Sequence, residues 1–427
     1  VLAGSPLKLF SLSQAGQTIA ECIERAQPLP QGHEVLTERL LNAGAIHPVP
    51  SAEDSARFAL NTVTAVVPAH IRTAQDAAAL KSLVESCSAL HRVVVIDDCS
   101  PHALPDLGAA RVIRLETNSG PAAARNAGIA TVDTEFIACI DVDVAITDRT
   151  ISQLLPYFAD DTVALVAPRV KSHVSTNFIG EYEVAASVLD MGETEARVRA
   201  GTRVSYVPSA MWLCRTTALR SLSGFDESLR SGEDVDMVWR LNDAGWRCRY
   251  QPQAECSHLP RTSLHKFLLQ RVSYGASAAA LAKRHTGKLA PAKFNVWQAS
   301  TWLLVLLGMP FIALGVAIVA SASTAQKLRR FPQLRDESFQ ISLRGTAQSA
   351  QTAASALNRV WWPLAFITAI FSQRLRVLFI AAALAPAVYE WWIQRPHLDV
   401  VRFTLMKMLD NAAYGAGVWK GVVAQRN

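Results

Sequence analysis

Two aspartates directly follow an apolar run near the middle of the chain. Asp141 and Asp143 stand one residue apart after 136–140, whose sequence FIACI is typical of a buried strand. Carboxylates at this spacing can hold Mg²⁺ or Mn²⁺, ions that proteins commonly share with substrate phosphates. A bound ion would neutralise a diphosphate and stabilise it as a leaving group. The D-x-D pair alone is a weak signal, because an aspartate here can equally be a helix N-cap.

Polar residues also follow two earlier apolar runs. Pro68, Ala69 and His70 come after the first run, and Asp98 comes after the second. A carboxylate such as that of Asp98 can accept the imide N–H of a uracil ring. Because ligands of parallel sheets gather at the carboxyl ends of the strands, we expect these residues to share one crevice with the D-x-D.

The segment 118–128, NSGPAAARNAG, has the small residues of a tight helix start. Its free backbone N–H groups and an arginine side chain suit an anionic phosphate. Pro121 is an ordinary first helical residue and the alanines are packing, but this structural reading explains the arginine and the second asparagine poorly. We therefore predict four donor-binding residues in this segment: Asn118, Gly120, Arg125 and Asn126.

An acidic pair, Glu233 and Asp234, precedes an amphipathic stretch in GEDVDMVWR, residues 232–240. Such a pair can merely cap a helix electrostatically. Its chemical interpretation is a general base, because displacing a nucleoside diphosphate from an anomeric carbon needs a carboxylate that takes the acceptor hydroxyl proton. His258 lies beyond this pair and is a candidate third metal ligand, although a lone histidine is more often structural.

The order of these motifs resembles the family 2 glycosyltransferases over about residues 61–285. The matching motifs are VVPA, DDCS, NSGPAAARNAG, the D-x-D and GFDE followed by GEDVD and WR. The resemblance implies a GT-A fold, which is a Rossmann-like α/β fold with a mainly parallel sheet. It also implies an inverting, metal-dependent transfer of a sugar from a nucleotide-sugar donor.

The resemblance assigns roles to individual acids. It implies that Asp98 contacts uracil, Asp141 the ribose and the metal, Asp143 the metal, and that Asp234 is the catalytic base. One departure is at the first strand, where His70 and the following isoleucine replace the usual aromatic residue and asparagine. A second departure is the absence of the Q-x-x-R-W of processive synthases, which favours the addition of one or a few sugars.

The elements that must position these residues alternate between strand and helix. Continuous Val/Ile runs separated by helical stretches are typical of a parallel sheet covered on both faces. The expected strands are 63–67, 93–96, 111–115, 136–140 and 163–166, and the expected helices include 76–90 and 121–130.

Residues 1–55 have their own apolar pattern, which predicts a small winged-helix-like unit. A short strand precedes two helices, with Ser13 as the N-cap of the first and Gly44 at the end of the second. A DNA-reading helix needs a basic face, and the charges here are balanced to slightly acidic. We therefore favour peptide recognition and expect no nucleic-acid partner.

The C-terminal part, 297–427, is predicted to be a membrane-associated helical region. The segment 302–323 contains no charged residue and can cross the hydrocarbon core as one helix, which Pro310 would only kink. A second apolar region, 361–393, has tryptophans at both ends, where interfacial aromatics belong. One crossing and two short interfacial helices explain it equally well, so the topology stays open.

Composition agrees with a catalytic domain, expected at 61–290, between two further parts. The chain has 427 residues, half of them hydrophobic, and a mean hydropathy of +0.16, so some apolar surface must be hidden in lipid or against a partner. The formal charge of +6 suits nucleic acid, anionic lipid or a nucleoside diphosphate. Seven scattered cysteines without C-x-x-C favour a reducing compartment.

The chain has a small N-terminal unit that ends in AGAIHP at 43–48, then the catalytic domain, then apolar helices. In this organisation it resembles the mycofactocin-system glycosyltransferases of actinobacteria. That resemblance implies transfer of glucose from UDP-glucose, with Mg²⁺ or Mn²⁺, onto a redox cofactor made from the Val-Tyr end of a peptide. We expect the protein at the cytoplasmic face of the cell membrane, in contact with lipid through its C-terminal region.

Three alternatives stay open. The acceptor can instead be a lipid-linked cell-envelope glycan, which the C-terminal apolar region suits directly. A catalytically inactive sugar- or peptide-binding adaptor is disfavoured by the intact acids at 98, 141, 143 and 234. A winged-helix DNA regulator fused to a sensor domain would have to bind DNA with a strong salt dependence.

Overall fold

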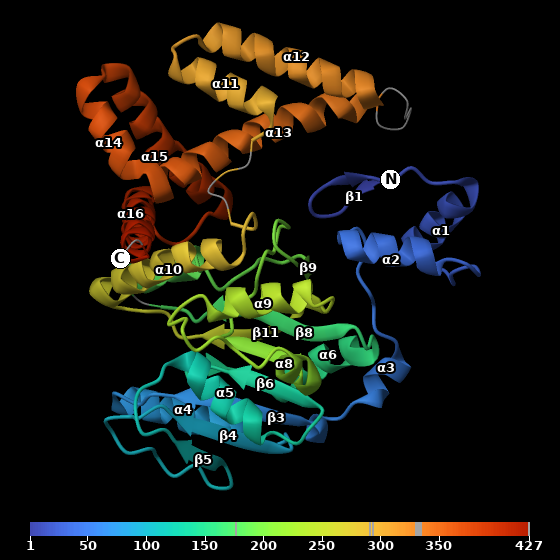
Figure 1. Ribbon diagram of the computed structural model, residues 1–427, viewed down its shortest axis with the longest axis vertical. Coiled ribbons are helices and arrows are strands. Elements are labelled where there is room, and N and C mark those ends of the chain that lie inside the picture. The colour runs from blue at the N-terminus through green and yellow to red at the C-terminus, as the bar shows by residue number, and fades with distance from the viewer. Residues whose placement is uncertain (176, 290–291, 293, 329–334, 426–427) are drawn as a thin grey trace. The chain divides into compact units, whose positions relative to one another are not determined.

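The computed structural model describes residues 1–175, 177–289, 292, 294–328 and 335–425 (Figure 1). The chain divides into two compact units, of which the first contains 1–174 and 186–260 and the second 175–185 and 261–427. The N-terminal segment therefore belongs to the same unit as the predicted catalytic strands. The helix Leu264–Arg284, which lies within the range 61–290 that we assigned to the catalytic domain, groups with the C-terminal helices.

A nine-stranded mixed sheet forms the centre of the first unit. The strand order is β5-β4-β3-β6-β10-β8-β11-β7, with β9 paired to β11. Strands β5, β4, β3 and β6 are parallel neighbours, as are β8 and β11. The five expected strands are all present, which confirms the mainly parallel α/β fold. The strands are β3 Val63–Ala69, β4 Arg92–Asp97, β5 Arg111–Arg114, β6 Phe136–Ile140, β7 Val144–Ala145, β8 Val163–Ser172, β9 Ala196–Val198, β10 Met211–Arg215 and β11 Arg247–His258.

Both faces of the parallel strands are covered by helices. Successive side chains of a strand point to opposite faces, and here the two sets join different clusters. Val67 of β3 and Val95 of β4 pack with Leu80 of α4 (Ala74–Ser86). Ile96 of β4 packs on the other face with Ala124 of α5 (Pro121–Thr131), which Figure 1 shows in front of the sheet. This explains why these strands are continuous apolar runs.

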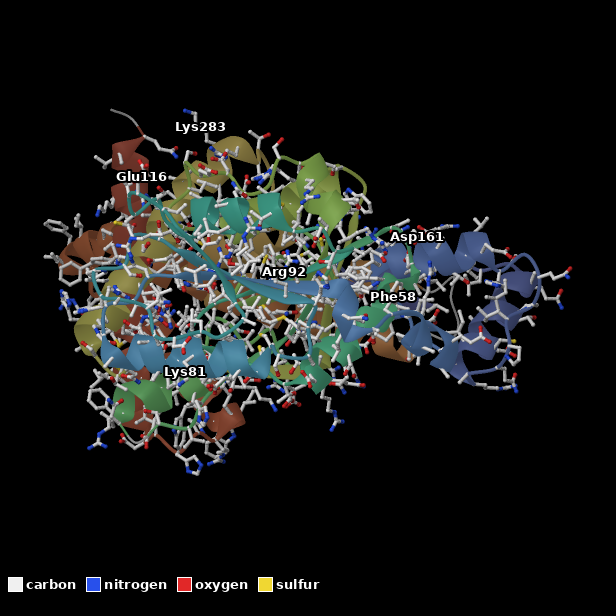
Figure 2. All side chains as sticks on the ribbon, turned by 90° about the horizontal axis from the view of Figure 1, so that it is seen from below. Phe58, Lys81, Arg92, Glu116, Asp161 and Lys283 are labelled. Carbon is white, nitrogen blue, oxygen red and sulfur yellow. The ribbon has the colours of Figure 1, made fainter. Side chains whose placement is uncertain are left out.

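The remaining helices of the first unit connect the strands. Phe58, labelled in Figure 2, follows the short helix α3 and packs edge-on against Phe136 of β6, with ring centroids 5.2 Å apart. This contact holds the entry to the sheet in place. These helices are α3 Ala52–Arg57, η1 Leu60–Thr62, α6 Asp148–Leu154, η2 Leu155–Ala159, α8 Thr216–Ser221 and α9 Glu233–Asp243.

The N-terminal segment folds as a small hairpin and two helices. The elements are β1 Leu2–Ala3, β2 Lys8–Leu9, α1 Gln14–Glu24 and α2 Glu34–Ala43. The hydroxyl of Ser13 accepts the N–H of Gly16, and Gly44 ends α2 in the left-handed conformation, so both predicted helix boundaries are confirmed. An ion pair between Glu38 and Arg247 joins α2 to β11 of the same unit.

The second unit is helical within its described residues. Its elements are α7 Phe178–Ala185, α10 Leu264–Arg284, α11 Val296–Leu306, α12 Pro310–Leu328, α13 Arg335–Ala356, a π-helical turn at Leu357–Trp361, α14 Trp362–Phe371, α15 Gln373–Gln394 and α16 Val400–Ala424. α7 reaches this unit from the middle of the sequence.

The expectation of one kinked helix over 302–323 is wrong. Gly308 adopts a left-handed backbone with φ 78°, so α11 ends before it and α12 starts after it at Pro310. The two helices lie side by side as a hairpin (Figure 1). Among the described residues, α15 is the one helix long and apolar enough to cross a bilayer, by length and composition.

Buried charges connect three helices of the second unit. The guanidinium of Arg271 on α10 lies 3.4 Å from Glu183 of α7 and 3.1 Å from Asp410 of α16. The hydroxyl of Tyr182 donates to Asp410 over 3.1 Å. Because a buried charge is costly unless it is paired, this network specifies how α7, α10 and α16 pack.

Candidate active site

The carboxylate of Asp98 organises the loop before α5. Asp98 is 5% exposed, and its two oxygens accept the N–H of Ser119 at 2.7 Å and of Gly120 at 2.9 Å. Parallel pairing of β3 with β4 puts this residue beside the end of β3, where the N–H of Asp98 donates to the carbonyl of Ala69. The structure therefore brings together the residues predicted from the first strand, the second strand and the helix start.

His70 and Asn118 line the same edge. The Nδ1 atom of His70 lies 2.9 Å from the carbonyl oxygen of Asp98 and 3.2 Å from the side-chain nitrogen of Asn118. Pro68 and Ala69 place the histidine at this point by ending β3. The imidazole ring is half-buried, whereas Asn118 is exposed. A base-sized ligand can thus meet a flat ring and amide groups at this edge.

Arg125 is not a free phosphate-binding cation, which corrects the sequence prediction. Its side chain is 2% exposed, and its guanidinium lies 2.6 Å from Asp141 and 2.9 Å from Glu233. It also packs over the ring of Phe225 at 5.5 Å. Arg125 neutralises acids of the site instead of facing a ligand.

Asn126 is also occupied within the protein. Its side-chain nitrogen donates to the carbonyl of Phe225 and to the carboxylate of Glu227, both at 2.9 Å, and its oxygen accepts the N–H of Phe225 at 2.8 Å. The predicted donor contact is therefore replaced by a positioning function. Asn126 ties α5 to the segment GFDE, which leads to α9.

The second half of the D-x-D meets the predicted histidine. Antiparallel pairing of β7 with β11 sets His258 opposite Val144, directly after Asp143. The Nε2 atom of His258 lies 3.0 Å from a carboxylate oxygen of Asp143, whose side chain is 46% exposed. Sequence alone separates these residues by more than a hundred positions, so only the sheet brings them together.

The donor atoms fit a divalent ion that substrate oxygens would complete. A carboxylate and an imidazole at 3.0 Å are ligand types that Mn²⁺ accepts. Asp141, in contrast, directs one oxygen at Arg125, and burial raises its pKa to about 6. In the described part of the chain, no group of three His, Cys, Asp or Glu side chains is assembled as a metal site by protein alone.

The acidic pair lies at the start of α9. Asp234 accepts the N–H of Val235 at 2.7 Å and that of Ser209 at 3.4 Å. Burial, and then the neighbouring Glu233, raise the pKa of Asp234 to about 7. Glu233 is buried and paired with Arg125, whereas Asp234 keeps contact with solvent. Of the two, Asp234 is thus the carboxylate that an acceptor can reach and that can hold or release a proton near neutral pH.

One residue of this edge was not singled out from the sequence. Arg230 lies in the segment before α9, and its guanidinium reaches Asn118 and the start of α5. An exposed arginine between Leu229 and Ser231 is an ordinary surface residue, so nothing in the sequence pattern distinguishes it. Its position beside Asn118 and Gly120 depends on the fold, which brings the segment before α9 next to the start of α5.

Comparisons with known proteins agree with this geometry. A family model described as Glycosyl transferase family 2 matches residues 64–223. The chain is 38% identical over 445 aligned positions to the pre-mycofactocin glycosyltransferases of two Mycobacterium tuberculosis strains, CDC 1551 / Oshkosh and H37Rv, covering 100% of this chain and 92% of each relative. The succinoglycan biosynthesis protein ExoO of Rhizobium meliloti is 30% identical over 45% of this chain and 59% of its own length.

Solved structures resemble the chain more distantly. The mannosyltransferase of Pyrobaculum calidifontis, solved with GDP-Man and Mn²⁺, covers 78% of this chain and 97% of its own, with 17% identity and a TM-score of 0.43. The Staphylococcus aureus TarS fragment solved with UDP covers 67% and 90%, with 18% identity and a TM-score of 0.35. From the family match and the full-length relatives, the chain is a GT-A-type enzyme that belongs to glycosyltransferase family 2 and is a homologue of the pre-mycofactocin glycosyltransferases.

Proposed function

We propose that this enzyme transfers glucose from UDP-glucose, with inversion, onto a peptide-derived redox cofactor. The observation that carries the catalytic part is the pairing of Arg125 with Glu233, which leaves Asp234 as the reachable carboxylate at the start of α9. The acceptor follows from the full-length similarity to the pre-mycofactocin glycosyltransferases.

Asp234 acts as the general base in this proposal. It takes the proton of the acceptor hydroxyl, whose oxygen then forms a bond to the anomeric carbon as the bond to the nucleoside diphosphate breaks. One displacement of this kind inverts the anomeric configuration. Glu233 pairs with Arg125, and its charge adds to burial in raising the pKa of Asp234 toward the range in which a base works best.

Asp143 and His258 would hold the divalent ion, with Asp141 as the neighbouring carboxylate. Mg²⁺ or Mn²⁺ bound there would supply the positive charge that stabilises a departing diphosphate. On the protein side, His258 orients the carboxylate of Asp143 through their 3.0 Å contact. Removing either side chain leaves an incomplete ligand set.

The donor base and ribose would lie along the edge formed by His70, Asp98 and Asn118. The carboxylate of Asp98 has further lone pairs beside those that accept the two backbone N–H groups, so it can still meet the imide of a uracil. The half-buried ring of His70 offers a face for stacking.

A lipid-linked glycan is the second candidate acceptor, and the apolar surface of the second unit favours it. Helix α15 has 22 residues, and only 6% of its most apolar 18-residue stretch is buried. We propose that this helix, with α11, α12 and α14, attaches the enzyme to the cytoplasmic face of the membrane. Several large apolar side chains on these helices are at least 39% exposed: Phe311, Ile312, Phe366, Ile370, Phe371, Val377, Ile380, Leu384 and Trp392.

The test is UDP release by the detergent-purified full chain. The protein receives UDP-glucose and Mg²⁺ or Mn²⁺, with no acceptor, with the unglycosylated cofactor, or with a lipid-linked sugar. Release that rises with the cofactor, needs the metal and is lost in Asp143→Ala supports the proposal. Asp234→Asn should retain UDP binding and lose transfer. Release that rises with the lipid-linked sugar alone contradicts the proposed acceptor, and normal transfer by Asp234→Asn contradicts the proposed base.

A further inference from the structure

We infer that Arg230 is the cation that binds the diphosphate of the donor, in the place that the sequence pattern assigns to Arg125. The inference rests on the proposed function, because it requires a nucleoside diphosphate sugar as donor. Arg230 ends the short segment that Asn126 ties to α5, and the side chain of Leu229 anchors this segment in the interior. The guanidinium of Arg230 is exposed and extends toward Asn118, on the edge that we call the donor edge and that His70, Asp98 and Asn118 form.

The contacts of Arg230 place it at the start of α5. Its Nη1 atom lies 3.4 Å from the side-chain oxygen of Asn118, and both terminal nitrogens lie 3.5 Å from the carbonyl oxygen of that residue. These distances are at the upper limit of hydrogen bonding, and both acceptors are uncharged. A phosphate oxygen would be a stronger partner for the same nitrogen atoms, because both partners of that bond would be charged.

Gly120 leaves the room that this arginine occupies. A Cβ atom at position 120 would lie 3.0 Å from Nη1 and 3.4 Å from Cδ of Arg230, and the glycine backbone has φ 90°. The arginine stem therefore crosses directly over the turn whose N–H groups bind Asp98. The backbone of this turn and the guanidinium together form one surface that faces the expected donor edge.

Charge balance explains why the site needs this side chain. Carboxylates at positions 98, 141, 143, 233 and 234 belong to the candidate site, and a nucleoside diphosphate adds further negative charge. Arg125 is engaged by two of these carboxylates. Arg230 forms no ion pair with any residue in the described ranges, so its positive charge is available to a ligand. A divalent ion at Asp143 and Arg230 can then share the charge of the diphosphate.

The experiment compares ligands with and without phosphates on the full chain in detergent. Dissociation constants for UDP and for uridine are measured by calorimetry and ligand-observed NMR, with Mg²⁺ present. In Arg230→Gln, the Kd for UDP should rise roughly ten-fold or more, as expected for the loss of charged hydrogen bonds, and the Kd for uridine should not change. The Kd of Arg230→Lys for UDP should lie between those of the wild type and Arg230→Gln. Lysine keeps the positive charge but cannot form the two parallel hydrogen bonds of a guanidinium.

Arg111→Gln is the matched control. Arg111 is an exposed arginine at the start of β5, on the opposite edge of the sheet from the carboxyl ends, so its removal changes the net charge equally. UDP binding by this variant should equal that of the wild type. An unchanged UDP affinity in Arg230→Gln overturns the inference. An equal loss for UDP and uridine also overturns it, because Arg230 would then shape the nucleoside pocket.

The same measurements distinguish an error in the proposed donor nucleotide from an error in the proposed function of Arg230. If the wild type binds no UDP, the donor proposal is wrong, and the same comparison is made with GDP and guanosine. A selective loss of GDP binding in Arg230→Gln then supports the diphosphate assignment with another base. If the wild type binds neither diphosphate, both proposals are wrong.

Discussion

At the scale of single residues, the site depends on how one buried arginine divides the acids. Arg125 contacts Asp141 on the strand side and Glu233 on the helix side. Without it, the buried carboxylate of Glu233 and the partly exposed carboxylate of Asp141 would both lack this cation. With it, Asp234 is the reachable acid of the GED motif, and burial raises the pKa of this carboxyl group to about 7.

We expect Arg125→Met to destabilise the first unit by about 3–5 kcal/mol, because it leaves the buried carboxylate of Glu233 without its partner. Denaturant unfolding followed by circular dichroism measures this change. Adding Glu233→Gln to Arg125→Met should restore part of the loss, since one unpaired charge is removed. Arg111→Met, which removes an exposed arginine, should unfold like the wild type. An unfolding midpoint of Arg125→Met equal to that of the wild type would show that the pairing does not stabilise the fold.

The pH dependence of activity should report Asp234. Its pKa is raised to about 7, mainly by burial and further by Glu233. A base must be ionised, so kcat/KM should rise with pH, reach half of its maximum near pH 7 and become constant about one pH unit higher. Initial rates of UDP release across this range measure the profile. A rate that does not change between about pH 5 and about pH 8 would mean that another group accepts the proton.

The raised pKa of Asp234 should make the folded protein less stable as the pH rises, whereas activity increases. The native state holds the proton of Asp234 more tightly than the unfolded chain, whose carboxyl group has the ordinary value of 3.8. This contribution to stability is complete below that value and is lost as pH rises through about 7. The melting temperature of Asp234→Asn should therefore fall less than that of the wild type as the pH is raised. A parallel decline in both proteins would contradict the raised pKa.

At the scale of elements, short pairings decide which residues meet. The two-residue strand β7 pairs with the end of β11, and this places His258 beside Asp143. Pairing of β3 with β4 likewise places Ala69 beside Asp98, whose N–H donates to the carbonyl of Ala69. In the second unit, small residues allow α10 and α16 to approach so closely that their backbones touch.

Gly417 tests this close approach. A Cβ atom at this position of α16 would lie 2.1 Å from the carbonyl oxygen of Val272 on α10. Gly417→Leu should therefore separate the helices and destabilise the second unit by about 1–3 kcal/mol or more. Gly315→Ala is the control, because the space around Gly315 in α12 is open and alanine favours a helix. Thermal unfolding in detergent compares the two. Equal melting temperatures would contradict the packing argument.

At the scale of the whole molecule, chemistry and apolar surface belong to different units. The first unit contains the acids and the sheet, and the second contains the helices with exposed apolar side chains. At the end of α15, the guanidinium of Arg395 packs 4.0 Å from the ring centre of Trp392, a pairing suited to the boundary between lipid and water.

The full chain should float with lipid vesicles and resist extraction by salt, because apolar contact with lipid is not screened by ions. Ile380→Arg combined with Leu384→Arg places two charges on the exposed surface of α15 and should weaken this association strongly. Val112→Arg is the control, since Val112 is 47% exposed on β5 of the first unit. Flotation of the α15 double variant equal to that of the wild type would contradict membrane attachment through this helix.

Much of the fold follows from local pattern. The runs at 63–67, 93–96 and 136–140 are continuous because both faces of their strands are covered, and this pattern is visible without a structure. Helix boundaries at Ser13 and Gly44 depend on local backbone chemistry and were predicted for the same reason. The acids of the site were recognisable from the order of their motifs along the chain, because the D-x-D pair alone is a weak signal.

What the sequence determined by itself is therefore the α/β class, the edge of the sheet that carries the site, and the acids there. The tertiary structure decided which of these groups are available. It placed Arg125 between two carboxylates, engaged Asn126 with the GFDE segment, divided 302–323 into two helices and positioned Arg230 at the start of α5. The physical reason is that strands and caps depend on neighbours in sequence, whereas the partner of a side chain depends on segments about a hundred residues away that only folding brings into contact.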